Sequence, residues 1–237
     1  MIFDQSEYDV RCEWGERGVR LLAPVSDAVI IVDVLSFSTA VEIATSQGAL
    51  VFPYRWKDKT AHEYARTVNA EVADRDNVAG RSLSPVSLLN LPAATRLVLP
   101  SPNGSTLSLL SDKTPTLLGC LRNSEAAARS ALKRGRRVSV IPAGERWEDG
   151  SLRPCFEDLV GAGAVIYFLN GSLSPEAALA RSAFESAVPN LYDLLRGCSS
   201  GKEKILRSEE SDVKLAAEMN ISRCVPVLRE GAFVKES

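Results

Sequence analysis

Histidine is almost absent from this chain, whose 237 residues include only His62. Ser-His-Asp and Cys-His catalytic systems need a histidine to activate the nucleophile, so both classes are poorly supported. The shortage also directs any metal site toward oxygen ligands and away from zinc. Because His62 stands among charged residues in a helical pattern, we expect it to face solvent.

Cysteine is scarce and scattered. The five cysteines never form a C-x-x-C pair, so neither a disulfide framework nor a zinc site is indicated. They are Cys12, Cys120, Cys155, Cys198 and Cys224. Free thiols fit a reducing cytoplasm, which is the compartment we predict. With no histidine placed to activate it, Cys155 is interpreted as a structural thiol rather than a nucleophile.

The chain also lacks a strong charge of one sign and a long apolar run. A formal net charge of -2 removes the electrostatic reason to expect nucleic acid or an anionic membrane as a partner. The longest apolar run, residues 159–169, is far too short to cross a membrane, and residues 1–18 show no apolar stretch typical of a secretory signal. A small molecule is therefore the expected partner.

What is present is a repeated order of buried strand, polar loop and helix. Residues 28–34 (AVIIVDV) have no polar alternation and predict a fully buried strand. Further strands are predicted at residues 49–54, 96–100, 116–120 and 136–144. Helices are predicted at residues 38–48, 58–70, from 106 onward and 123–135, with Asn123 as an N-cap. Strands that alternate with helices predict a three-layer α/β/α fold with a mostly parallel sheet.

The C-terminal third is predicted to be rich in helices. One helix begins with Ser174 as N-cap and Pro175 at its first position. Two more helices and a short extended segment are predicted at residues 200–208, 209–220 and 225–234. Residues 76–94 lack periodicity and predict a long, partly buried loop of the kind that borders a site. We predict one α/β domain over residues 1–237, with a two-lobed interior as the alternative and a homodimer as the candidate assembly.

Polar residues follow the predicted strands at the edge where a parallel sheet binds its ligands. Asp33 ends an otherwise apolar strand, so it must be paired, exposed at the edge or bound to a ligand, unless it only caps the next helix. The loops expected beside it are SPNGST at residues 101–106, RNSE at 122–125 and the charged stretch at 145–158. Their carboxylates, hydroxyls and free N–H groups suit a phosphate and a divalent cation such as Mg²⁺. For SPNGST, which lacks the lysine of an ATP-binding loop, an ordinary turn with a helix cap is the alternative.

Glu157 and Asp158 fall in the first turn of a helix that Pro154 opens. A favourable interaction with the helix dipole can by itself explain two acids there. However, the helix is apolar on nearly every face, which predicts that it is buried and that the acids at its mouth face a crevice. Successive helical residues point about 100° apart, so we expect one acid to reach a metal and the other to support it.

Four motifs in order resemble the 2-phosphosulfolactate phosphatases, Mg²⁺-dependent enzymes of coenzyme M biosynthesis. The segments IVDVLSFSTAVEIATSQGA, LPSPNGST, GCLRNSEAAA and PAGERWEDGSLRPCFEDLVGAGAV look like that family's D-V-L-R-A-T-T, T-x-N-G-T, G-S-F-x-N-A and A-G-T…S-L-E-D-x-x-x-A-G segments. Asp212 and RCVPVLREG resemble its C-terminal D…VP element more loosely. The resemblance implies a phosphatase that hydrolyses 2-phospho-3-sulfolactate to 3-sulfolactate and phosphate.

From the resemblance and the chemistry of the residues we assign a candidate site. Asp33, Glu157 and Asp158 are the expected catalytic residues and Mg²⁺ ligands. The expected substrate-binding residues are Ser36, Arg81, Asn103, Gly104, Ser105, Thr106, Arg122, Asn123 and Arg153. Attack by water is favoured over an aspartyl-phosphate at Asp33, because no D-x-D-x-T motif is present.

The chain departs from the family pattern in ways that bear on its substrate. Ser36 stands where the family has an arginine, and ERWEDG is an insertion. The family's G-E-R…F-D-L-G-N-S-P region is reduced, although Arg81 and Ser84-Pro85 remain. A doubly anionic substrate needs cations, and Arg81, Arg122, Arg146 or Arg153 could replace the missing arginine. A phosphatase for an unrelated phosphoester and a non-catalytic protein that binds a phosphorylated or sulfonated metabolite are the alternative functions.

Overall fold

The computed structural model describes residues 2–74, 77 and 79–236, and within them it has an α/β fold. The strands are β1 (Val10–Cys12), β2 (Ala28–Val32), β3 (Leu50–Tyr54), β4 (Glu71–Val72), β5 (Arg96–Pro100), β6 (Thr116–Gly119), β7 (Val138–Pro142), β8 (Glu145–Arg146), β9 (Leu152–Arg153), β10 (Pro226–Arg229) and β11 (Ala232–Lys235). The α-helices are α1 (Gly15–Leu22), α2 (Phe37–Ser46), α3 (Thr60–Thr67), α4 (Gly104–Leu110), α5 (Ser124–Leu132), α6 (Phe156–Tyr167), α7 (Pro175–Ala187), α8 (Leu191–Gly197), α9 (Ser199–Leu206) and α10 (Glu210–Ala216).

Across the described residues, nine strands form one sheet in the order β1-β7-β2-β6-β10-β11-β3-β5-β4. The four strands from β1 to β6 pair in parallel, and so do the three strands β3, β5 and β4. The C-terminal hairpin of β10 and β11 lies between these two halves and pairs antiparallel on both sides. Three antiparallel pairings in succession give the halves opposite strand directions. The C-terminal segment, which the sequence predicted only as extended, therefore joins the two halves of the sheet.

Helices cover both faces of the sheet, as the fold class predicted. In β2, Ile30 and Val32 pack in one core cluster, which includes residues of α5, α6 and α7. Val29 and Ile31 point to the other face and pack in a second cluster, with residues of α1, α2 and α4. This division explains why β2 shows no polar alternation, since both of its faces are buried.

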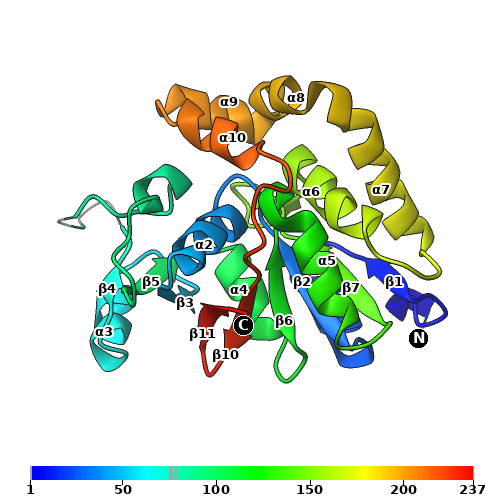
Figure 1. Cartoon of the computed structure of the whole chain (residues 1–237), viewed down its shortest axis with the longest axis horizontal. Coiled ribbons are helices and arrows are strands. Elements are labelled where there is room, and N and C mark those ends of the chain that lie inside the picture. The colour runs from blue at the N-terminus through cyan, green and yellow to red at the C-terminus, as the bar shows by residue number, and fades with distance from the viewer. Residues whose placement is uncertain (1, 75–76, 78, 237) are drawn as a thin grey trace.

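The C-terminal third is helical, as predicted. In Figure 1 the helices from α7 to α10, coloured yellow to orange, run as an arc along the upper side of the molecule. Ser174 caps α7, because its side chain accepts a hydrogen bond from the Ala177 N–H at 3.1 Å. Gly163 lets α6 pack closely on α7, since a Cβ there would lie 2.0 Å from the carbonyl oxygen of Ala180. No helix in the described part of the chain has the length and apolarity needed to span a membrane.

Several local predictions are refined. The expected loop at 76–94 contains a short 3₁₀ turn, Pro85–Leu88, and Leu88 is fully buried; Asp76 and Val78 lie outside the described residues. The charged insertion folds into the two-stranded β8–β9 hairpin. Asn123 is the N-cap residue of α5, as predicted, but its side chain makes no capping hydrogen bond to that helix. Its Oδ1 instead accepts a hydrogen bond from the Cys120 N–H at 2.8 Å, which closes the turn before the helix.

Candidate active site

Asp33 stands directly after β2 and is 7% exposed. Its Oδ1 accepts a hydrogen bond from the N–H of Phe37, the first residue of α2, at 3.2 Å. Its Oδ2 accepts one from the Gly104 N–H, the first residue of α4, at 3.1 Å. The helix-capping alternative is therefore part of the observed role of Asp33, and the same carboxylate also connects the ends of β2 and β5.

Gly104 can approach Asp33 because it has no side chain. A Cβ at this position would lie 2.3 Å from Cδ1 of Phe37, whose ring is fully buried. Any larger residue would push the SPNGST loop or Phe37 away. The next residue, Ser105, is buried and donates to the Leu99 carbonyl at 3.0 Å, so its hydroxyl holds the loop to β5.

Asp158 joins three segments at the start of α6. Its Oδ1 accepts from the Val34 N–H and its Oδ2 from the Gly144 N–H, both at 2.8 Å. Gly144, with a φ of 69°, lies in the left-handed region after β7, where glycine is favoured. The Asp158 side chain therefore fixes the turns after β2 and β7 relative to α6.

Glu157 and Glu145 are the other acids of this region. Glu157 is 3% exposed, and its Oε2 accepts a hydrogen bond from the Cys198 thiol at 3.3 Å. Glu145, at the start of the β8–β9 hairpin, accepts from the Asn103 side-chain amide at 2.8 Å. Asn103 and Gly104 are neighbours in one turn, and they donate hydrogen bonds to two different carboxylates, those of Glu145 and Asp33.

The acids are close enough to affect one another's ionisation. Burial, then the negative charges of Glu145 and Glu157, raise the pKa of Asp33 to about 7, against the opposing effect of its two backbone hydrogen bonds. Burial and the charges of Asp33 and Glu157 raise the pKa of Asp158 well above its ordinary value. Burial also raises the pKa of Glu145, and its hydrogen bond from Asn103 opposes this. The region therefore concentrates negative charge that a bound cation would relieve.

A cleft of about 740 Å³ lies in this region; of these acids Glu145 lines it, whereas Asp33, Glu157 and Asp158 are not among the described residues of its lining. Ser36 and Glu145 line it at this end, while α9 and the loop before α3 line other parts. This volume lies within the range of small-molecule sites, about 300–1,000 Å³.

A sequence model of the 2-phosphosulpholactate phosphatase family matches residues 20–231. The chain belongs to this family. It is 28% identical over 212 residues to the 2-phosphosulfolactate phosphatase of Methanothermobacter thermautotrophicus, with 87% of this chain and 88% of the relative covered. It is 23% identical over 222 residues to a "Probable 2-phosphosulfolactate phosphatase" of Pseudothermotoga lettingae, with 90% and 96% covered. As a member of the 2-phosphosulpholactate phosphatase family, the chain is a phosphoric monoester hydrolase.

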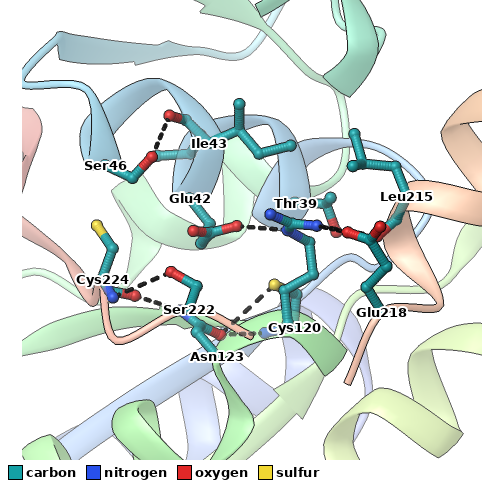
Figure 2. Close-up of polar contacts among 12 residues, drawn as sticks. Thr39, Glu42, Ile43, Ser46, Cys120, Asn123, Leu215, Glu218, Ser222 and Cys224 are labelled. Carbon is teal, nitrogen blue, oxygen red and sulfur yellow. Dashed lines mark hydrogen bonds and ion pairs between the residues drawn. The ribbon is translucent and has the colours of Figure 1, made fainter. Parts of the chain in front are cut away.

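Not every predicted residue lies at the cleft of this phosphatase. Arg122, 8% exposed, donates from Nε to Glu42 at 2.8 Å and pairs through Nη1 with Glu218. The amide of Asn123 donates to the carbonyl of Cys224 at 2.9 Å. Figure 2 shows Glu42, Asn123 and Glu218 in this buried polar network, which ties α2 to the C-terminal segment.

The other predicted arginines and Thr106 have separate positions. Arg81 pairs with Glu71, and Arg146 pairs with Glu16 at 2.5 Å. Arg153 donates to the hydroxyl of Ser200 at 3.2 Å, and Ser200 lines the cleft. Thr106 is 8% exposed within α4. Among the described residues that line the cleft, the predicted set contributes Ser36 directly and Arg153 through Ser200.

The described residues contain no group of three or more histidine, cysteine, aspartate or glutamate side chains arranged to hold a metal ion. The predicted ligands Asp33, Glu157 and Asp158 do not form such a group. Both oxygens of Asp158 accept backbone N–H groups, as do both oxygens of Asp33, so each carboxylate also supports the loops around it. The negative charge of Glu157 acts on Asp33 and contributes to the raised pKa of that carboxyl.

Most of the lining residues were not identified from the sequence, among them Lys57, Lys204 and Glu145. Lys57 follows the carboxyl end of β3, so the rule that led to the other loops could have found it. Lys204 lies in the last turn of α9, and no feature of the sequence indicates that this helix reaches the cleft. Nothing in the sequence distinguishes Glu145 from the other charged residues at 145–158.

Proposed function

We propose that the chain is a Mg²⁺-dependent phosphatase that hydrolyses 2-phospho-3-sulfolactate to 3-sulfolactate and phosphate. The names of both relatives support the substrate. The observation that carries the proposal is the contact of Asp33 with Gly104, because it brings Asp33 to the turn whose Asn103 holds Glu145 at the cleft. We also infer a role in coenzyme M biosynthesis and a cytoplasmic location, the latter supported by five free cysteines.

In this proposal Asp33 and Glu157 hold the ion. Mg²⁺ in enzymes of phosphate chemistry usually binds through one or two carboxylates, several waters and the substrate's phosphate, so a third protein ligand is not required. The negative charges of Asp33 and Glu157 repel each other, and a bound cation would reduce that repulsion. When bound, Mg²⁺ polarises the phosphoryl group and neutralises its charge. Asp158 would act through the backbone, by holding the Val34 and Gly144 turns in place.

The side chains around Asp33 also suggest how a proton moves. Glu145 lines the cleft, and burial raises the pKa of its carboxyl, which makes it a stronger base. We propose that Glu145 takes a proton from the attacking water as the phosphorus–oxygen bond to the hydroxy acid breaks. Glu145 returns this proton to the leaving oxygen, directly or through solvent, and the products are the free hydroxy acid and inorganic phosphate. We favour direct attack by water, because the chain has no D-x-D-x-T motif of the kind that accompanies an aspartyl-phosphate.

Ser36 supports one competing substrate class. Because a serine replaces the family's arginine at the cleft, an unrelated small phosphoester is the second candidate. Phosphate release from phosphosulfolactate, phospholactate, phosphoglycolate and sugar phosphates, measured with Mg²⁺ and with EDTA, separates the two. We expect the highest kcat/KM with phosphosulfolactate and loss of activity in EDTA that Mg²⁺ restores. Preference for a sugar phosphate would reject the substrate, and full activity in EDTA would reject the ion.

A further inference from the structure

The cleft continues well beyond the acids around Asp33. One part of its wall is a face of α9 that carries Ser200, Glu203, Lys204 and Arg207. Another part is the loop and first turn at residues 57–62, between β3 and α3. A phosphoryl group would occupy only the end near Ser36 and Glu145. The remaining volume is therefore available to the rest of a substrate.

The loop before α3 brings Lys57 and Lys59 to the cleft, with Asp58 between them. Elsewhere on its wall, Arg207 pairs with Glu203 and His62 with Asp74. Lys57 and Lys59 are exposed, and neither forms an ion pair with any of the described residues. An unpaired ammonium group at a cleft wall is free to bind an anionic group of a ligand.

Lys204 is a third cation on the wall, and it is held in place. Its side chain is 13% exposed, and Nζ donates to Glu209 at 2.9 Å and to Asp212 at 3.1 Å. Asp212 is 1% exposed, and its other oxygen accepts from the Ser84 hydroxyl at 2.7 Å. Since Ser84 also lines the cleft, Asp212 positions two parts of the wall. An ammonium group has three N–H donors, so Lys204 keeps one for a ligand.

We propose that Lys57, Lys59 and Lys204, which lie on two parts of the cleft wall, bind a second anionic group of the substrate. The ligand class is a phosphorylated hydroxy acid with a distal carboxylate or sulfonate. The inference rests on the proposed function. It also explains how the substrate could bind although Ser36 stands where the family has an arginine: the positive charges come instead from the loop after β3 and from α9.

The test compares three phosphate esters that differ in their other charges. These are 2-phospho-3-sulfolactate, 2-phospholactate and isopropyl phosphate. In the double variant Lys57→Met/Lys59→Met we expect KM for phosphosulfolactate to rise about three- to tenfold with kcat nearly unchanged, because exposed ion pairs are individually modest. For isopropyl phosphate, kcat/KM should change less than about twofold. Lys113→Met, at an exposed lysine of the loop between α4 and β6, is the matched control and should leave all constants unchanged.

Lys204→Met tests the third cation, but it leaves Asp212 buried without its ammonium partner, so its thermal stability must be measured in parallel. The exposed double variant avoids this difficulty. Equal loss of kcat/KM for all three esters, or no change in KM for phosphosulfolactate, overturns the inference while leaving the phosphatase intact.

Binding of 3-sulfolactate, measured by calorimetry, separates the inference from the proposed function. If wild type hydrolyses none of the esters but binds sulfolactate, with a Kd raised in the double variant, the second-anion site stands and the proposed function fails. If sulfolactate does not bind, or binds equally to both proteins, the second-anion site fails.

Discussion

The Gly104 N–H donates to Oδ2 of Asp33 at 3.1 Å, across 71 residues of sequence. Gly104 follows β5 and Asp33 follows β2, so the bond joins strands from the two oppositely directed halves of the sheet. The residue before Gly104, Asn103, holds Glu145 through its side-chain amide, so this one turn brings Asp33 and Glu145 to the same place.

Gly104→Ala should weaken both the fold and the site. The new Cβ would lie within 2.8 Å of three carbon atoms of Phe37, so we expect a loss of about 1–3 kcal/mol in the free energy of unfolding, measured by urea denaturation. Activity should fall further than stability explains, because Gly104 would move away from Asp33. Gly197→Ala, where a Cβ meets nothing within 4 Å, is the control and should be close to neutral. A stable, fully active Gly104→Ala variant would contradict the account.

Asp33→Asn should abolish most phosphatase activity while the protein stays folded. The variant keeps the size of the side chain but removes the charge proposed to hold Mg²⁺, so we expect kcat/KM to fall at least about 100-fold. Stabilisation of wild type by Mg²⁺ in a thermal melt should disappear in the same variant. Asp193→Asn, at an exposed residue of α8, should change neither quantity. Retained Mg²⁺ stabilisation in Asp33→Asn would place the ion elsewhere.

The raised pKa of Asp33 makes stability depend on pH. In the unfolded chain this carboxyl loses its proton near its ordinary pKa of 3.8, whereas in the folded protein its pKa is about 7. The folded state therefore binds the proton more tightly, and the contribution to stability is full below pH 4 and lost as pH rises to about 7. The loss is on the order of 1.4 kcal/mol per pKa unit. In urea denaturation with EDTA present, the free energy of unfolding should fall more steeply over this pH range for wild type than for Asp33→Asn. Parallel pH curves for the two proteins would contradict the raised pKa of Asp33.

Arg122→Met should destabilise the protein through Glu42. That carboxylate is 1% exposed, and losing its partner leaves a buried charge, at a cost of about 3–5 kcal/mol. Replacing both partners, in Glu42→Met/Arg122→Met, should recover much of the loss, because no unpaired charge remains. Arg129→Met, which breaks the exposed pair with Glu125, should cost less than about 1 kcal/mol. If the two single arginine variants lose equal stability, the buried network in Figure 2 is not needed for the fold.

Arg122 and Asn123 were predicted to bind substrate, but their side chains form contacts within the protein. Both stand in a polar loop after a strand, which is the usual place for binding residues. Their contacts are decided by Glu42, 80 residues earlier, and by Cys224, 101 residues later. No local pattern indicates which of several distant acids or carbonyls an arginine or an asparagine will meet, so a binding residue and a structural residue look alike in the sequence.

By itself the sequence determined the α/β class, the buried strand that ends in Asp33, and the polar loops that follow the strands. It also carried the family's motifs in order. These features are local, because apolar runs, helix caps and turn residues act within a few positions. Only the tertiary structure decided that the C-terminal hairpin lies between the two halves of the sheet, and that Lys57 and Lys204 line the same cleft. Those outcomes depend on how distant segments pack around a common core, which no single segment encodes.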